Sequence, residues 1–172
     1  GYSTYHVAGH SLGGLLSLEL AAAHSDRIAT ATVLASGRVR SPRTAAVFDA
    51  LIAVREMPGG EEAWLRTLYP WIFGPQFFET PQNVEDALEA ALAYPFGQTL
   101  EAMKQQVAAF KAFRPRATPE AVTCPTLVVY AGQDIMIPPA LARPSFAPIP
   151  MLTESNIDHA GHSIVWDAPE DT

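Results

Sequence analysis

A serine motif near the start of the sequence constrains the fold more than any other feature. The motif Gly9-x-Ser11-x-Gly13 follows a short run of β-formers at 5–8 and precedes an apolar, helix-forming segment at 15–24. A β-branched, apolar run at 28–35 comes next and predicts a buried parallel strand. Strand, tight turn, helix and strand in this order predict a βαβ unit.

The spacing of the motif favours Ser11 as a nucleophile on a sharp turn between the strand and the helix. Glycines at 9 and 13 would let such a turn close without a clash from a Cβ atom. The helix that follows would point its N-terminus at the place where negative charge develops during the reaction. The alternative is a glycine-rich turn that contains an incidental serine.

A serine hydroxyl needs a base that accepts its proton, and two histidines late in the sequence are candidates. His162 follows a glycine and precedes the start of a predicted helix, so it can lie on a loop and reach the serine. We therefore predict His162 as the base, with His159 as the alternative.

The base in turn needs an acid that fixes its tautomer. Asp134 comes directly after a predicted buried strand at 126–131, whereas Asp158 lies too close in sequence to His162 to come from a different strand end. Parallel sheets form their sites at the C-terminal ends of the strands, so we expect Asp134 to meet Ser11 and His162 there. The alternative for Asp134 is a role as the N-cap of the next segment.

The middle of the sequence has a different pattern from its two ends. Segments of helical period at 46–55, 61–69, after Asn83 and around 100–113 are separated by proline and glycine. We therefore predict a core built from residues 1–37 and 124–172, with a helical insertion at 38–123. A last strand is expected at 151–153.

Three stretches of the sequence resemble the α/β-hydrolase family. Val-Ala-Gly-His-Ser-Leu-Gly-Gly at 7–14 resembles the family's nucleophile elbow, and the run at 124–134 that ends in Asp134 resembles its acid strand. Gly-His-Ser at 161–163, with Pro-Glu at 169–170, resembles its histidine loop. The order Ser, Asp, His is also the order of this family.

The resemblance implies an α/β-hydrolase fold with a mostly parallel sheet and a helical cap over the pocket. It also implies a serine hydrolase that cleaves a carboxylic ester, or a related lactone or acyl bond, through an acyl-enzyme and without a cofactor. The backbone N–H of Leu12 would donate one hydrogen bond to the oxyanion. Family members place further strands and helices before the elbow, so a preceding segment or a second chain is expected to complete the fold.

Other functions share this machinery. Cofactor-free perhydrolases of the haloperoxidase type and carbon–carbon bond hydrolases use the same triad. A ligand receptor that keeps the triad, or a catalytically incomplete fragment, is a further alternative. Candidate pocket residues are adjacent to the nucleophile, aromatic or polarisable: His10, Trp64, Trp71, Phe73 and Met136. For the aromatic ones, the alternative is packing inside the insertion.

Charge and composition exclude several classes of function. The net charge is −7, whereas a nucleic-acid-binding protein typically has a basic surface. Apolar runs stay well short of the roughly 20 residues that a membrane-spanning helix needs. The single cysteine, Cys124, excludes an internal disulfide framework. His159 and His162 have helical spacing but lack a cluster of further ligands, so no metal site is predicted.

Overall fold

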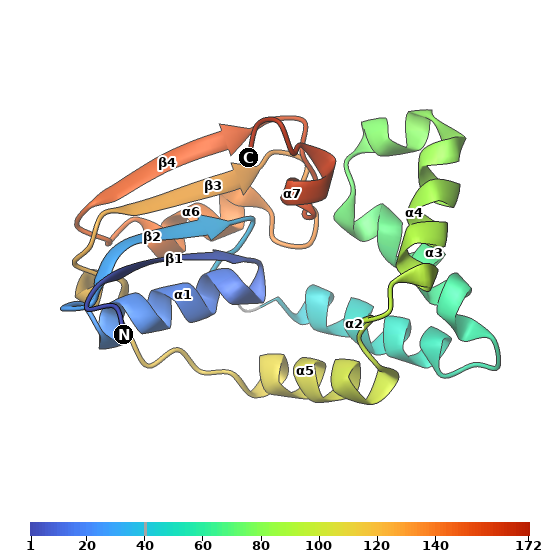
Figure 1. The fold of residues 1–172 in the computed structure, drawn as a ribbon, viewed down its shortest axis with the longest axis horizontal. Coiled ribbons are helices and arrows are strands. Elements are labelled where there is room, and N and C mark those ends of the chain that lie inside the picture. Colours follow the sequence, from blue (N-terminus) through green and yellow to red (C-terminus); the bar gives the residue numbers. More distant parts are fainter. Residues whose placement is uncertain (40) are drawn as a thin grey trace.

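The computed structural model describes residues 1–39 and 41–172, and a parallel sheet forms its centre (Figure 1). Strands β1 (Tyr5–His10), β2 (Ile28–Leu34), β3 (Thr126–Ala131) and β4 (Leu152–Ile157) lie side by side in that order. Each strand pairs with the next in parallel, and α1 (Leu12–Ala23) connects β1 to β2. The predicted βαβ unit is therefore confirmed.

Helices cover both faces of this sheet. Helix α1 and α6 (Pro139–Phe146) lie on one face, and the short α7 (Ile164–Asp167) lies on the other (Figure 1). Val128 packs in the cluster beneath α1 and α6, whereas its neighbour Val129 packs in the cluster beneath α7. Successive side chains of a strand point to opposite faces, and both faces of β3 are covered, which explains why most of its residues are apolar.

A helical segment connects β2 to β3, and its α-helices lie beyond one end of the sheet (Figure 1). Its elements are α2 (Pro42–Arg55), α3 (Gly60–Ile72), the 3-10 turn η1 (Pro75–Glu79), α4 (Pro81–Ala93), α5 (Leu100–Ala112) and the 3-10 turn η2 (Pro119–Ala121). The four predicted helical stretches each fall on one of these helices. Asn83 is not an N-cap, because α4 already begins at Pro81; its side chain donates to the carbonyl of Phe77 at 3.0 Å instead.

One buried arginine joins the helices of this segment. The guanidinium of Arg55, at the end of α2, forms an ion pair with Glu61 at 2.5 Å and donates to the carbonyl of Gln98. It also lies over the ring of Trp64, 4.0 Å from the ring centroid. A buried charge is tolerated where such partners satisfy it, so Arg55 holds α2, α3 and the start of α5 in fixed relation.

Within residues 1–39 and 41–172, each helix is too short or too polar to span a lipid bilayer.

Candidate active site

Ser11 lies on the tight turn between β1 and α1, in a backbone conformation that is rare for a residue with a side chain. Its φ is 53° and its ψ is −120°, a strained combination that costs about 1–3 kcal/mol. The Ser11 N–H donates to the carbonyl of Leu34 at 3.0 Å, and the hydroxyl of Ser36 donates to the carbonyl of Ser11 at 2.6 Å. These bonds to the end of β2 hold the turn in its strained form.

Two glycines allow this turn to form, and one of them, Gly9, was expected, whereas the other was not. A Cβ atom on Gly9 would lie 2.1 Å from the carbonyl oxygen of Gly13, which confirms the need for glycine at position 9. A Cβ atom on Gly13 would meet open space, so the expectation for Gly13 is wrong. The close approach occurs one residue later, where a Cβ atom on Gly14 would lie 2.8 Å from the Cβ of Ser36.

The structure brings the three predicted residues together at the C-terminal ends of β1, β3 and β4. The Nε2 atom of His162 lies 2.8 Å from Ser11 Oγ, and its Nδ1 atom lies 2.8 Å from Asp134 Oδ2. The other oxygen of Asp134 accepts the N–H groups of Met136 and Ile137 at 2.8 and 2.7 Å. An ionised carboxylate only accepts, so Nδ1 carries the hydrogen and Nε2 is left to accept from the serine.

The alternative base and acid lie away from the serine. The side chain of His159 is 52% exposed and lies 3.3 Å from the carboxylate of Asp171 at the surface. Asp158 is exposed as well, and its carboxylate accepts from the side chain of Asn156. In contrast, His162 is 8% and Asp134 is 3% exposed.

His10, predicted to contact substrate, instead holds the loop that carries His162. Its Nε2 atom donates to the carbonyl of His162 at 2.6 Å, and it is not part of the pocket wall described below. Burial lowers the pKa of the His10 imidazole, an effect that the hydrogen bond to the His162 carbonyl opposes. The neutral form is therefore favoured, with its hydrogen on Nε2.

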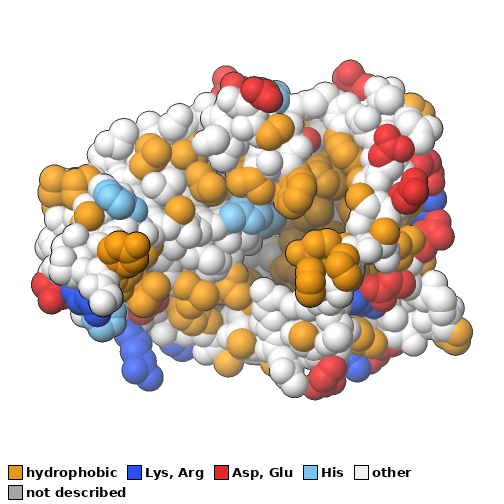
Figure 2. All heavy atoms as spheres, in the orientation of Figure 1, with side chains coloured by type: hydrophobic (Ala, Val, Ile, Leu, Met, Phe, Trp, Pro, Cys, Tyr) orange, Lys and Arg blue, Asp and Glu red, His pale blue; other side chains and the backbone are white. Residues whose placement is uncertain are grey.

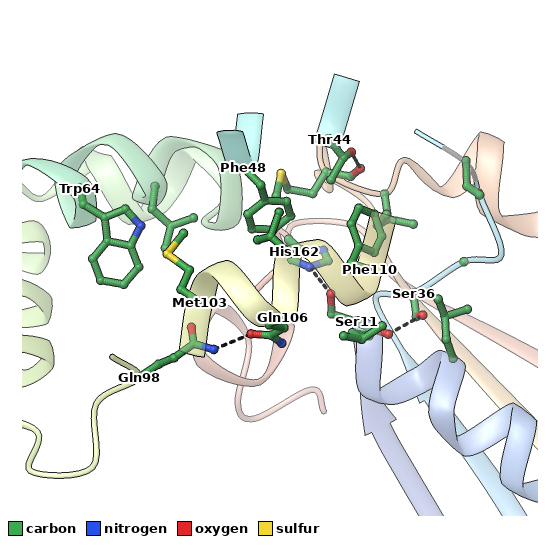
Figure 3. Close-up of a pocket in the computed structure, with 18 residues that line it drawn as sticks. Ser11, Ser36, Thr44, Phe48, Trp64, Gln98, Met103, Gln106, Phe110 and His162 are labelled. Atoms are coloured by element: carbon green, nitrogen blue, oxygen red, sulfur yellow. Dashed lines mark hydrogen bonds between the residues drawn. The ribbon is translucent and has the colours of Figure 1, made fainter. Parts of the chain in front are cut away.

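A cavity of about 200 Å³ opens beside Ser11 and His162. Figure 2 shows a hollow between the sheet and the helical segment, with hydrophobic side chains around it and histidine side chains at its edge. The part of the wall outside the helices of that segment comes from α1, from the loop after β2 and from the loop after β3. The helical segment supplies the remaining wall (Figure 3), which includes Thr44, Phe48, Trp64, Leu68, Gln98, Met103, Gln106, Val107 and Phe110.

Two of the predicted aromatic residues do not line this cavity, whereas Trp64 and Met136 do. The ring of Trp71 is covered by the guanidinium of Arg43, 5.2 Å from its centroid. Phe73 is stacked on Phe77, with ring centroids 4.0 Å apart, inside the helical segment. The aromatic residues therefore lie in the segment that helps to line the cavity, but Trp71 and Phe73 pack against other side chains of that segment.

Sequence reasoning offered Met103 of α5 as a possible wall residue, with core packing as the alternative, but missed Val107 and Phe110 of the same helix. Met103, Val107 and Phe110 recur at helical spacing, which marks one face of a helix but does not tell what that face contacts. Polar groups that the helical segment adds to the wall include Thr44, a hydrogen-bonded amide pair, Gln98 to Gln106 at 2.6 Å, and the indole of Trp64 (Figure 3). Among the described residues, the buried Nε1–H of Trp64 has no hydrogen-bond partner.

Residues 1–39 and 41–172 contain no group of three or more His, Cys, Asp or Glu side chains arranged to hold a metal ion.

Comparison with known proteins places the chain in a family. A family model described as "Alpha/beta hydrolase family" matches residues 2–172. The chain belongs to the alpha/beta hydrolase family. The predicted fold class is thereby confirmed, and the strand–turn–helix around Ser11 is the element of the fold that carries the predicted nucleophile.

Individual relatives extend beyond the length of this chain. A protein of Variovorax paradoxus (strain S110) named "Putative carbamate hydrolase RutD" is 30% identical over 161 residues, which are 92% of this chain and 59% of that protein. MGS-M2, an alpha/beta hydrolase enzyme from a Medee basin deep-sea metagenome library, has a TM-score of 0.81 at 20% identity, covering 99% of this chain and 62% of its own.

A thermophilic esterase from Thermogutta terrifontis has a TM-score of 0.76 at 24% identity, over 98% of this chain and 61% of its own. At these identities the likeness to solved structures shows the fold alone.

Proposed function

We propose that this chain carries the catalytic residues of a serine hydrolase that cleaves a carboxylic ester through an acyl-enzyme. The observation that carries the proposal is the continuous hydrogen-bonded series from Ser11 Oγ through His162 to Asp134, at the wall of an apolar cavity. A serine hydroxyl with a neutral imidazole in hydrogen-bond reach, oriented by a buried carboxylate, is the arrangement that nucleophilic acyl transfer needs.

The first half of the reaction forms the acyl-enzyme. Ser11 Oγ attacks the ester carbonyl carbon while His162 Nε2 takes the hydroxyl proton, and Asp134 stabilises the resulting imidazolium. The carbonyl oxygen becomes an oxyanion. Leu12 is the first residue of α1, so its N–H has no partner inside the helix and is free to donate to that oxygen. The tetrahedral intermediate then expels the alcohol, which leaves with the proton from His162.

The second half releases the acid. A water molecule attacks the acyl carbon and gives a proton to His162 Nε2. The new intermediate collapses, Ser11 recovers its proton from His162, and the carboxylic acid departs. Every proton transfer uses His162 Nε2, so His162 Nδ1, which faces Asp134, keeps its hydrogen throughout.

The cavity supports an ester with a short apolar group as the substrate. Its wall is dominated by aliphatic and aromatic side chains from α2, α3 and α5, and a volume of about 200 Å³ suits a group of a few carbon atoms. Burial of each methylene in such a wall stabilises the complex by about 0.8 kcal/mol.

A carbamate is a second candidate substrate, supported by the name of the relative from Variovorax paradoxus. A carbamate presents the same acyl carbon to Ser11, with nitrogen on one side of the carbonyl group. Donation from that nitrogen lowers the reactivity of the carbon, so we expect slower acylation with a carbamate than with an ester of the same size.

The test compares the full natural protein with its Ser11→Ala variant on p-nitrophenyl acetate, p-nitrophenyl butyrate and a p-nitrophenyl carbamate. We expect ester turnover in the wild type and a loss of about 10⁴- to 10⁶-fold in Ser11→Ala. Ser25→Ala, at an exposed position after α1, is the matched control and should keep wild-type rates. Equal turnover in Ser11→Ala and the wild type would remove Ser11 from the mechanism.

A further inference from the structure

One carboxylate connects the loop of His162 to the helical segment. Asp167 is the last residue of α7, and its Oδ2 atom accepts the N–H of Gly161 at 2.6 Å and the N–H of Gly74 at 2.7 Å. Gly161 directly precedes His162, whereas Gly74 lies between α3 and η1. A single oxygen atom therefore joins two backbone segments that are 87 residues apart in sequence, as 161 − 74 gives.

The two segments are in direct backbone contact at this point. A Cβ atom on Gly161 would lie 2.5 Å from the nitrogen of Gly74, and one on Gly74 would lie 2.7 Å from the carbonyl oxygen of His159. Both glycines are buried. Neither position has room for a side chain, so the two backbones pack directly against each other, and the carboxylate of Asp167 accepts the N–H groups that this contact buries.

Several hydrogen bonds hold the backbone around His162, and some of them reach the helical segment, including one from the side chain of Gln76 to the carbonyl of His159. Asp167, which also binds Gly74, accepts from the N–H of Gly161. The carbonyl of His162 accepts from His10, and the N–H of Ser163 donates to the carbonyl of Ile72 at the end of α3 at 2.7 Å. The position of the imidazole over Ser11 therefore depends on where the end of α3 lies.

We propose that Asp167 is a positioning residue for the reaction: it fixes the His162 loop to the end of α3 and thereby aligns Nε2 on Ser11. This inference rests on the proposed function. Hydrogen bonds from N–H groups to a carboxylate are stronger than those between neutral groups, which suits an atom that must hold two donors at once. When Asp167 is removed, the loop loses this anchor and the imidazole samples positions away from the hydroxyl.

The test uses Asp167→Ala and Asp167→Asn in the full natural protein, with Asp171→Ala as the matched control. Asp171 lies in the same segment, but its carboxylate is exposed and pairs with the exposed His159. An asparagine oxygen has two lone pairs and can accept both N–H groups, so Asp167→Asn should retain most of the activity. A displacement of about 1 Å at the reacting atoms lowers turnover by about 10²-fold, which is the loss in kcat that we expect for Asp167→Ala.

The steady-state constants separate alignment from general damage. The cavity wall does not include Asp167, so KM for p-nitrophenyl butyrate should stay near the wild-type value while kcat falls. Labelling of Ser11 by a fluorophosphonate should slow in parallel, because it needs the same base. If Asp167→Ala does not fold, Asp167→Ser, which keeps a hydroxyl too short to reach both donors, is measured instead.

Two results would overturn the proposal: a wild-type kcat in Asp167→Ala, or an equal loss in Asp167→Asn and Asp167→Ala. Failure of the proposed function looks different, because the wild-type protein itself would then neither turn over the ester nor react with the fluorophosphonate.

Discussion

At the scale of single residues, Asp134 shows how the surrounding backbone decides what a side chain can do. One carboxylate oxygen is committed to two N–H groups of its own loop, those of Met136 and Ile137, and the other accepts from His162. The carboxylate therefore cannot turn, and the hydrogen on His162 must sit on Nδ1. The loop from Asp134 to Ile137 therefore determines how the imidazole of His162 is oriented.

The first prediction replaces this acid by its amide. In Asp134→Asn, the oxygen stays on the two N–H groups and the amide NH₂ faces His162, which then carries its hydrogen on Nε2 and cannot take a proton from Ser11. We expect kcat to fall about 10⁴-fold with the fold retained, measured by ester hydrolysis and circular dichroism. Asp158→Asn, at an exposed position, is the control. A loss of less than tenfold in Asp134→Asn would contradict this role.

The second prediction concerns the stability that His10 links to pH. The folded-state pKa of His10 is lowered from 6.5, chiefly by burial, so the unfolded chain binds a proton before the folded chain does as the pH falls. Stability from this group is complete above about pH 6.5 and is lost as the pH falls below it. The free energy of unfolding should therefore fall more steeply in this range for the wild type than for His10→Gln.

Urea unfolding at a series of pH values measures this difference. His24→Gln, at an exposed position, should keep the wild-type slope. Parallel pH profiles for the wild type and His10→Gln would show that His10 is not the group responsible.

Residue identity could be predicted where the motif itself carries the information. Ser11, Asp134 and His162 stand at recognisable spacings, and the structure brings them together. The contacts of His10 and Gly14 could not be foreseen, because each depends on an atom far away in sequence: the carbonyl of His162 and the side chain of Ser36.

At the scale of elements, the close approach of α1 to the end of β2 holds the turn that carries Ser11. Gly14 is the contact point, where a Cβ atom would meet Ser36 at 2.8 Å and Val33 at 3.0 Å. The neighbouring Gly13 has open space around the same position. A side chain would therefore clash at Gly14 but would find space at the adjacent Gly13.

The third prediction uses this pair. Gly14→Ala overpacks the contact between α1 and β2 and should lower the free energy of unfolding by about 1–3 kcal/mol, with a further loss of ester turnover as the turn shifts. Gly13→Ala is the matched control and should be neutral, or stabilising by up to about 1 kcal/mol, because alanine favours a helix. Chemical denaturation measures both; equal destabilisation by the two substitutions would contradict the packing described here.

Elements were predictable where a periodic apolar pattern defines them. The buried strands β2 and β3 are nearly continuous apolar runs, and their predicted bounds agree with the structure to within a residue. Strand β4 runs from Leu152 to Ile157 and so extends beyond the predicted 151–153. The prediction ended too early because the exposed residues Glu154, Ser155 and Asn156 do not alternate with apolar residues.

At the scale of the whole molecule, the cavity lies where the helical segment meets the sheet. Ser11 and His162, the proposed reacting groups, lie at the sheet, and α2, α3 and α5 supply most of the apolar wall. Substrate size should therefore be set by the helical segment, independently of the triad.

Which helix faces turn toward the serine could not be predicted, since that depends on tertiary packing such as the contacts of Arg55.

The fourth prediction narrows this wall. Val107→Phe, on the buried face of α5, should lower kcat/KM for p-nitrophenyl hexanoate about tenfold or more relative to the acetate ester, because the longer acyl group loses its space. Ala108→Phe, on the exposed face of the same helix, should leave the ratio unchanged. An unaltered ratio in Val107→Phe would place the acyl group elsewhere.

The most direct test of the central claim is covalent labelling of Ser11. The full natural protein is exposed to a fluorophosphonate, and its intact mass and peptide map are recorded. The account predicts one added phosphonyl group, located on Ser11 with loss of fluoride, and slow labelling in His162→Ala but not in His159→Ala. An unmodified protein, or an adduct that persists in Ser11→Ala, would contradict the assignment of Ser11 as an activated nucleophile.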